Sequence, residues 1–89
     1  MIQRMKYIFV DETWEDYLYW QATDKKMLKR IHDLLKDISL NPFSGIGKPE
    51  PLKFKYKGFW SRRMNEEHRL IYQVKDNEII IVKCRFQSD

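Results

Sequence analysis

One carboxylate in this 89-residue chain stands between two prolines. Pro49 fixes the backbone dihedral before Glu50, and Pro51 pushes Glu50 itself toward an extended conformation. A carboxylate mounted on so stiff a backbone is suited to take a proton from a substrate. The competing interpretation is an ordinary surface glutamate in a proline-rich turn, and the pattern alone leaves both open.

A dense group of basic side chains follows this carboxylate, with aromatic residues between them. Its members are Lys53, Lys55, Lys57, Arg62, Arg63 and Arg69. Cations hold a polyanion by its phosphates, and aromatic faces stack on unpaired bases. The stretch therefore suggests a protein that binds RNA and carries a group able to cut it.

The net charge of +4 comes entirely from the second half of the chain. Residues 1–40 hold seven basic and seven acidic side chains, whereas residues 41–89 hold ten and six. This excess is either an ordinary solvated surface or a patch that binds nucleic acid or an acidic protein.

The arginines in this half of the chain can also be interpreted in more than one way. Arg69 either pairs with a phosphate through its planar fork or forms an ion pair with Glu66 or Glu67. Arg62 and Arg63 are adjacent, so on a strand they point to opposite faces and only one of them can face a substrate.

Several other kinds of site are not predicted. One cysteine and two distant histidines do not make a metal-ligand set, and Gly45 to Gly47 is too short for a phosphate-binding loop. We therefore expect neither a metal nor another cofactor. His68 is more readily explained as a structural histidine than as a catalytic acid, and Cys84 is expected to point into the core.

The predicted elements place two helices before a series of strands. A β-rich run predicts a first strand, Asp11 is suited to cap the helix after it, and Thr23 or Asp24 opens a second helix that ends at Asn41–Pro42. That second helix has apolar residues at three- and four-residue spacing, which predicts one buried stripe. The predicted strands are Lys6 to Val10, Gly58 to Met64, Arg69 to Val74 and Glu78 to Phe86, with a further short one over Leu52 to Tyr56 and a tight hairpin at Lys75 to Glu78.

This order predicts a single α+β domain over residues 1–89, with two N-terminal helices packed on one face of an antiparallel sheet of four to five strands. No apolar run is long enough to span a membrane, and the start lacks the apolar stretch of a signal peptide. With one cysteine no internal disulfide can form, so we expect a cytoplasmic protein.

Strand periodicity sorts the side chains of the predicted sheet into two faces. One face receives Leu70, Tyr72, Val74, Ile80, Val82, Cys84 and Phe86, and the other receives Arg69, Ile71, Gln73, Lys83, Arg85 and Gln87. Arg63 shares a face with Ser61 in its own strand. Arg69, Arg85 and Gln87 are thus expected on one open surface, unless a bulge reverses part of the pattern.

Four segments in this order, WEDYLYWQATDKK, IGKPEPLK, GFWSRR and EEHRLIY, resemble the YoeB/Txe toxins of bacterial toxin–antitoxin pairs. The resemblance runs from about Lys6 to Arg85. It implies a RelE-like fold, cleavage of messenger RNA in the ribosomal A site, and silencing by a YefM-like antitoxin. It also implies a homodimer, for which Trp14 and Trp20 are candidate contacts.

The resemblance also implies roles for single residues. Glu50 would be the general base that removes the proton of a 2′-hydroxyl, and Arg69 would stabilise the charge on the phosphate. This route needs no metal and leaves a cyclic phosphate. Lys53 and Arg63 match further cations of the family site, and we add Lys55 and Arg85 as RNA-binding candidates.

The C-terminus departs from the family pattern, which ends in His-Tyr with the histidine as general acid. The matching positions hold Gln87 and Ser88, followed by Asp89. A glutamine amide donates a hydrogen bond but releases no proton near neutral pH. The alternative function is therefore a catalytically weakened module that binds a ribosome or antitoxin, unless another cation, such as Lys53, Lys83 or Arg85, protonates the leaving oxygen. A gyrase poison of the ParE kind is a third possibility, against which the GKPEPLK and WSRR segments argue.

Overall fold

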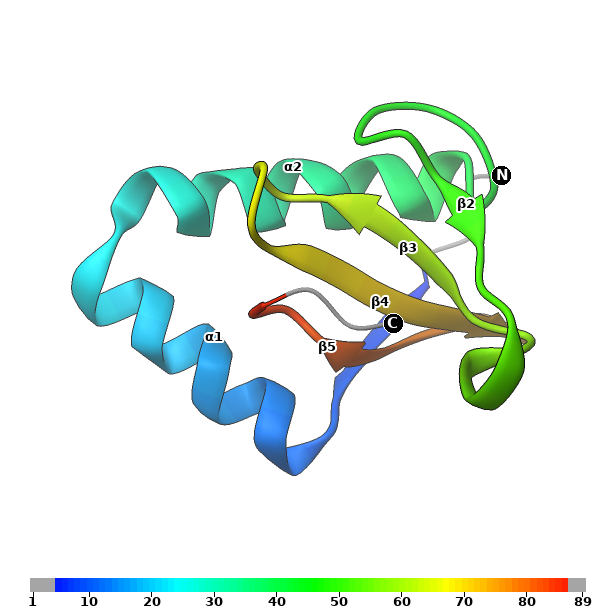
Figure 1. Ribbon diagram of the computed structural model, residues 1–89, viewed down its shortest axis with the longest axis horizontal. Helices are drawn as coiled ribbons and strands as arrows, with labels where there is room; N and C mark the ends of the chain where they lie inside the picture. Colours follow the sequence, from blue (N-terminus) through cyan, green and yellow to red (C-terminus); the bar gives the residue numbers. More distant parts are fainter. Residues whose placement is uncertain (1–4, 87–89) are drawn as a thin grey trace.

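A computed structural model of the chain describes residues 5–86. Two long helices and five strands make up the fold, with a short 3₁₀ turn near the middle of the sequence (Figure 1). The elements are β1 (Lys6–Phe9), α1 (Asp11–Thr23), α2 (Lys25–Leu40), β2 (Glu50–Pro51), η1 (Phe54–Tyr56), β3 (Trp60–Arg63), β4 (Arg69–Lys75) and β5 (Glu78–Lys83).

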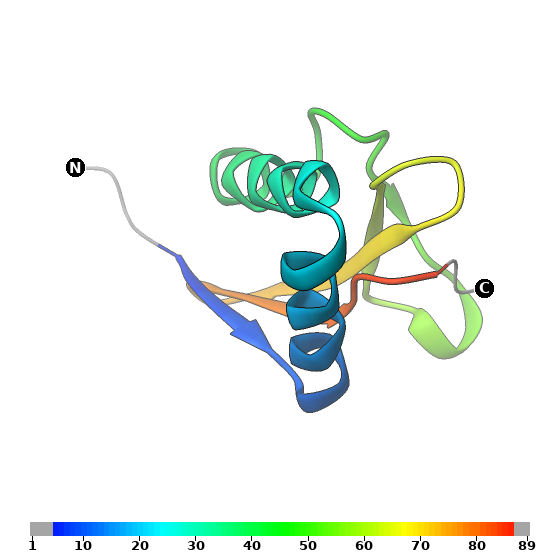
Figure 2. The same ribbon diagram turned by 90° about the vertical axis from the view of Figure 1, so that its left-hand side faces the viewer.

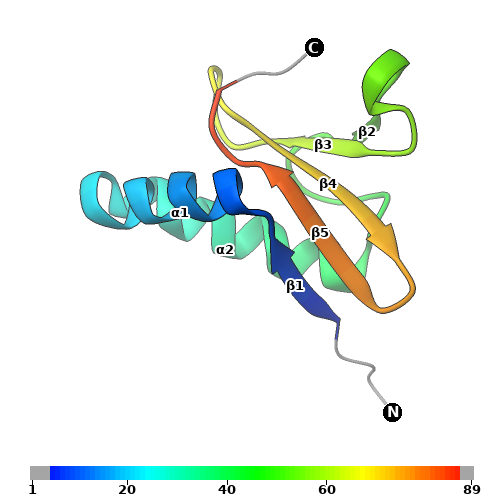
Figure 3. The same cartoon turned by 90° about the horizontal axis from the view of Figure 1, so that it is seen from below.

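The strands form one sheet in the order β1-β5-β4-β3-β2, and both helices cover the same face of it (Figure 2). The predicted α+β fold is confirmed. Neighbouring strands are antiparallel except β1 and β5, which are parallel, so the sheet is mixed rather than wholly antiparallel. Figure 3 shows β1, β5, β4 and β3 side by side, with α2 behind them and α1 to their left.

Helix α2 carries the apolar stripe that its sequence predicts. Asp24 caps the helix by accepting a hydrogen bond from the backbone N–H of Met27 at 3.0 Å. Asp11, in contrast, does not cap α1: Val10 is the cap residue, and Asp11 lies in the first turn, where its charge still favours the positive end of the helix. The stripe of α2 packs on the sheet to form the core, which contains Trp20, Met27, Ile31, Leu34, Leu35, Ile38, Met64, Leu70, Tyr72, Ile79, Ile81 and Cys84.

A bulge in β5 changes which of its side chains face this core. Tyr72 pairs with Ile81 but the preceding residue of β4, Ile71, pairs with Lys83, so Val82 is an extra residue in the ladder. The buried residues are therefore Ile79 and Ile81 on one side of the bulge and Cys84 on the other. The prediction that Ile80, Val82 and Phe86 face inward is wrong: the first two are only partly buried, and Phe86 is exposed.

Cys84 lies in the core, as predicted, and its thiol is fully buried. Burial, with a smaller contribution from the negative charge of Asp16, raises the pKa of the Cys84 thiol to about 12. Because the thiolate is the reactive form, we expect the folded protein to resist modification by Ellman's reagent at pH 8, and to react fully in guanidinium chloride. Rapid modification of the folded protein would contradict this burial.

The raised pKa of Cys84 also makes stability depend on pH. Above a pH of about 9 the thiol ionises in the unfolded chain but not in the folded protein, so this group lowers stability as pH rises.

Candidate active site

The loop that leads to Glu50 is fixed onto β3 through Gly47. Its carbonyl accepts a hydrogen bond from the backbone N–H of Arg63 at 2.7 Å, and its φ of +81° is in the region that favours glycine. A Cβ at this position would lie 2.8 Å from Cδ2 of Leu34. The glycine thus lets the loop approach helix and strand closely, and it sets the starting point of the Pro49–Glu50–Pro51 segment.

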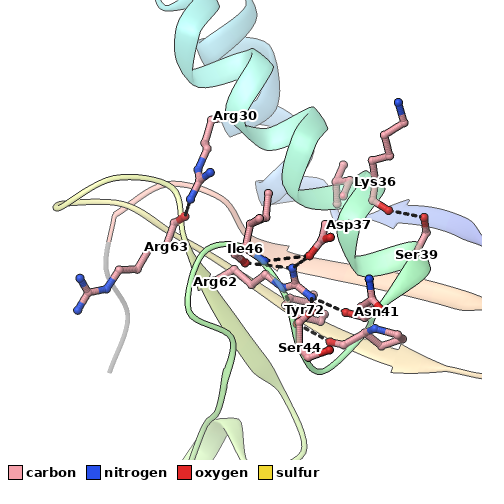
Figure 4. A network of polar contacts seen from close by, with 12 residues as sticks. Arg30, Lys36, Asp37, Ser39, Asn41, Ser44, Ile46, Arg62, Arg63 and Tyr72 are labelled. Atoms are coloured by element: carbon pink, nitrogen blue, oxygen red, sulfur yellow. Dashed lines mark hydrogen bonds and ion pairs between the residues drawn. The ribbon is translucent and has the colours of Figure 1, made fainter.

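Arg62 fixes the earlier part of the same loop from inside the protein (Figure 4). Its side chain is fully buried, and its guanidinium donates hydrogen bonds to the carboxylate of Asp37 and to the hydroxyl of Tyr72. Further bonds go to the carbonyl oxygens of Asn41, Ser44 and Ile46. The hydrogen bond from Arg62 holds the pKa of Asp37 below its ordinary value, whereas burial raises the pKa of Tyr72. Arg62 is therefore a structural cation that joins α2, the loop and the sheet.

Glu50 and Arg69 meet on the face of the sheet opposite the helices. Nη1 of Arg69 lies 3.1 Å from Oε1 of Glu50 and donates a second hydrogen bond to Oγ of Ser61 at 3.2 Å. Strand register explains the meeting, because Glu50 pairs with Ser61 across β2 and β3, and Arg63 pairs with Arg69 across β3 and β4. Arg69 thus pairs with Glu50, not with Glu66 or Glu67 as the alternative interpretation had it.

The two charges differ in their access to solvent. The side chain of Glu50 is 58% exposed, whereas that of Arg69 is only 17% exposed. A carboxylate open to solvent can receive a proton from a bound molecule, and a partly buried guanidinium with a fixed partner can hold an anionic group in one place. The pair therefore has the elements of a general base beside an oxyanion-binding cation.

Three more of the predicted RNA-binding residues are exposed on this part of the molecule. Arg63 lies directly across from Arg69 in the ladder, and its side chain points away from the Arg62 network in Figure 4. Lys53 lines a hollow of about 320 Å³ together with Glu50, and Lys55 follows it in η1. Lys53 and Arg63 thus lie on the same side as the carboxylate, as binding of a polyanion requires.

Arg85 is not part of this group, contrary to the sequence-based expectation. Its guanidinium lies 3.7 Å from the carboxylate of Asp16 and 3.7 Å from the centre of the Tyr19 ring, so it packs against α1. The physical reason is that β5 ends at Lys83, so the strand alternation that would have placed Arg85 with Arg69 does not extend to this residue.

His68 is a structural residue in the described part of the chain. It is 7% exposed, and its Nδ1 accepts a hydrogen bond from the backbone N–H of Phe86 at 2.6 Å. The Phe86 carbonyl in turn accepts from the backbone N–H of Arg69 at 3.3 Å, and Nε1 of Trp20 donates to the Cys84 carbonyl at 2.8 Å. These bonds hold residues 84–86 beside the start of β4, whereas Gln87 itself lies outside the described residues.

Ser61 is a site residue that we did not single out from the sequence. Its hydroxyl is fully buried between β2 and β4 and accepts the hydrogen bond that orients Arg69. The signal was present in the alternation of β3, which puts Ser61 on the same face as Arg63. Serine is a common small polar residue, and only the strand register, which pairs Ser61 with Glu50, identifies it as part of the site.

A larger hollow of about 440 Å³ lies elsewhere, between β1 and the helices. It is lined by Tyr7, Phe9, Tyr17, His32, Asp33, Leu35 and Lys36, and it contains neither Glu50 nor Arg69. We place the candidate site at the smaller hollow because the carboxylate and the cations meet there. Within residues 5–86, no three His, Cys, Asp or Glu side chains gather into a group that could hold a metal ion, and no helix is long and apolar enough to cross a membrane.

Comparison with known proteins agrees with the geometry. The family described as the YoeB-like toxin of bacterial type II toxin–antitoxin systems matches residues 9–88. Toxin YoeB of Escherichia coli K12 is 56% identical over 82 residues, which cover 92% of this chain and 98% of that protein.

Two solved structures of Staphylococcus aureus YoeB are also similar over nearly their whole length. The heterotetrameric YoeB–YefM complex contains a chain with 48% identity and a TM-score of 0.89, and the YoeB dimer one with 48% identity and a TM-score of 0.91. In both comparisons the match covers 97% of this chain and 100% of the other. The match to the family over most of the sequence, and the shared fold, show that this chain belongs to the YoeB family of toxins from bacterial type II toxin–antitoxin systems.

Proposed function

We propose that this toxin is a ribosome-dependent endoribonuclease that cleaves messenger RNA in the A site and so inhibits translation. The observation that carries the proposal is the contact of 3.1 Å between the exposed carboxylate of Glu50 and the guanidinium of Arg69. Both groups lie on the face of the sheet that the helices leave uncovered, where the cations Lys53, Lys55 and Arg63 can bind the RNA backbone.

In the proposed reaction Glu50 takes the proton of a ribose 2′-hydroxyl. The 2′-oxygen then attacks the adjacent phosphorus, and the bond between phosphorus and the 5′-oxygen breaks. The products are a 2′,3′-cyclic phosphate and a free 5′-hydroxyl, and the route requires no metal ion. In the free protein Arg69 is occupied by Glu50, so the incoming phosphate has to replace the carboxylate as a partner of the guanidinium while Ser61 keeps its orientation. Arg69 then stabilises the negative charge that develops on the phosphate oxygens.

The leaving 5′-oxygen must also receive a proton, and Gln87 cannot supply one. Of the three cations that we considered as proton donors, we favour Lys53, because it lines the same hollow as Glu50. Arg85 is engaged by Asp16 and Tyr19 of α1. The second candidate function is therefore a toxin with weak cleavage that acts mainly by occupying the ribosome, and the glutamine at position 87 is the observation that favours it.

Restoring a proton donor at the C-terminus tests this part of the proposal. We expect Gln87→His to raise the rate of A-site cleavage by about 10²-fold, the lower end of what a positioned acid contributes, since Ser88 still stands where the family has tyrosine. Primer extension on messenger RNA from translating ribosomes measures the rate, and Gln87→Asn is the control without a titratable group. Equal cleavage by Gln87→His and the original protein would show that another group already acts as the acid.

The proposed partners follow from charge and from the relatives. A YefM-like antitoxin is assigned as the inhibitor, because an acidic peptide would be attracted to the cations beside Glu50 and would keep RNA away. A homodimer is also proposed, by analogy with the Staphylococcus aureus toxin. Trp14 is 47% exposed and suits such a contact, but Trp20 is 5% exposed and donates its N–H to the Cys84 carbonyl, so it is excluded as a dimer residue.

A further inference from the structure

Two features of Phe54, which lies beside the candidate site, are energetically unfavourable. Its side chain is 92% exposed, so its ring gains nothing from burial in the protein. Its φ is +58°, in the left-handed region that a bulky residue rarely adopts. A glycine at this position would remove both costs. An outlier of this kind that persists next to a functional site is a reason to look for a role.

The turn that carries Phe54 is well fixed, so the ring is presented by ordered backbone. The carbonyl of Lys53 accepts from the N–H of Tyr56 at 3.2 Å, and that of Phe54 accepts from the N–H of Lys57 at 3.0 Å. The N–H of Leu52 donates to the carbonyl of Phe59 at 2.9 Å and closes the base of the turn. The backbone that carries the exposed ring is therefore held at a defined place relative to β2.

That place is the hollow of about 320 Å³ that also contains the proposed base. Its lining consists of Glu50, Pro51, Leu52, Lys53, Phe54 and Tyr56. The hollow thus brings together an aromatic face, apolar side chains, a cation and the carboxylate. An apolar slot lined by two aromatic side chains, Phe54 and Tyr56, and a neighbouring cation suits an unpaired nucleobase whose phosphate lies beside it.

We propose that this hollow is a base-binding subsite, in which a messenger-RNA base next to the cleaved bond stacks on the ring of Phe54. The proposal rests on the proposed function, since it assigns a binding role at the same site. Base–aromatic stacking contributes about 1–3 kcal/mol per base, which corresponds to about 5- to 150-fold in affinity. Phe54 would then hold the nucleotide in register with Glu50, and its exposure in the free protein is the condition for doing so.

The test uses ribosomes programmed with a messenger that carries 2-aminopurine at one position of the A-site codon at a time. All variants are made in a Glu50→Gln background so that the RNA stays intact. We expect one position to show a fluorescence change on toxin binding that Phe54→Trp keeps and Phe54→Leu loses, with a dissociation constant about 5- to 150-fold higher for Phe54→Leu. Phe43→Leu is the matched control, because Phe43 is also an exposed phenylalanine but contacts Trp60 instead of the hollow.

Other outcomes would overturn either the subsite or the proposed nuclease function. If Phe54→Leu keeps both the affinity and the fluorescence change, the subsite is overturned. The subsite is also overturned if Phe54→Leu loses as much affinity for ribosomes whose messenger ends before the A site as for ribosomes with a complete messenger. In that case the base stacked on Phe54 would belong to the ribosome and not to the messenger. Cleavage by the original protein is measured in parallel by primer extension. A Phe54-dependent signal without cleavage would overturn the proposed nuclease function and support the subsite, whereas cleavage without that signal would do the reverse.

Discussion

Replacing Glu50 by glutamine is expected to lower the rate of messenger cleavage by about 10²–10⁴-fold while the protein still folds and binds ribosomes. A positioned general base commonly contributes this much, and a glutamine amide cannot take the proton of a 2′-hydroxyl. Folding should be unaffected because the Glu50 side chain is 58% exposed, and exposed ion pairs contribute little to stability. Single-turnover cleavage on programmed ribosomes, followed by primer extension, gives the rate.

The same substitution separates catalysis from binding. Glu50 neutralises Arg69 in the free protein, so its replacement frees a cation for phosphate and adds one unit of net positive charge. We therefore expect the variant to bind programmed ribosomes at least as tightly as the original chain, with the loss confined to the chemical step. If the variant instead binds more weakly and cleaves normally at saturation, Glu50 is a binding residue and not the base.

Glu66→Gln is the matched control for this experiment. Glu66 is an exposed glutamate in the loop before Arg69, and its replacement changes the net charge by the same amount. It should leave cleavage unchanged. Expression in cells adds a second reading: growth arrest of equal strength by the original chain and by Glu50→Gln would mean that the toxin acts by occupying the ribosome, which is the alternative function.

Helix α2 was predictable because one simple periodicity describes it. The apolar residues of α2 recur at three and four positions, and the structure buries that stripe against the sheet. Its start at Asp24 and its end before Pro42 follow from capping and from the restriction that proline imposes on the preceding residue. These are local effects, and local effects can be read from the chain.

The sheet was harder to predict because its side-chain alternation depends on register. In β3 and β4 the alternation is unbroken, so the expectation that Arg63 and Ser61 share a face is confirmed, and the strand register adds Arg69 to that face. In β5 one extra residue at Val82 reverses the pattern. As a result Ile79 and Ile81 face the core instead of Ile80 and Val82, and no residue type in the strand indicates the bulge. Arg85 lies beyond the end of β5, where strand alternation no longer applies, and it contacts α1.

The candidate site likewise combines a local feature that the sequence shows with tertiary contacts that it does not show. Two prolines beside Glu50 indicated a rigid carboxylate, but the strand pairing that brings Arg69 to within 3.1 Å is a tertiary contact. The role of Arg62 could not be foreseen either. Its sequence neighbourhood showed only that Arg62 and Arg63 oppose each other, and which of them is buried depends on the position of α2 and its loop.

Arg62→Met is expected to lower the free energy of unfolding by about 3–5 kcal/mol at pH 7. Methionine is close to arginine in length but leaves the Asp37 carboxylate and the carbonyls of Asn41, Ser44 and Ile46 without their donor. Breaking a buried charge pair by removing one partner has a cost of this order, because the other charge stays uncompensated. Urea unfolding followed by circular dichroism measures the change, and Arg63→Met, at the exposed neighbouring position, should stay within about 0.5 kcal/mol.

The dependence of this loss on pH identifies its cause. The hydrogen bond from Arg62 lowers the pKa of Asp37 in the folded protein, so the pair stabilises the fold above the unfolded pKa of about 4, and this contribution disappears as pH falls through the folded value. The difference in stability between the original chain and Arg62→Met should therefore shrink as pH falls below about 4. A difference that stays constant over this range would mean that the charge pair is not responsible, and that the lost carbonyl hydrogen bonds carry the whole effect. Because the loop held by Arg62 leads directly to Glu50, we also expect the variant to cleave more slowly than its folded fraction alone would explain.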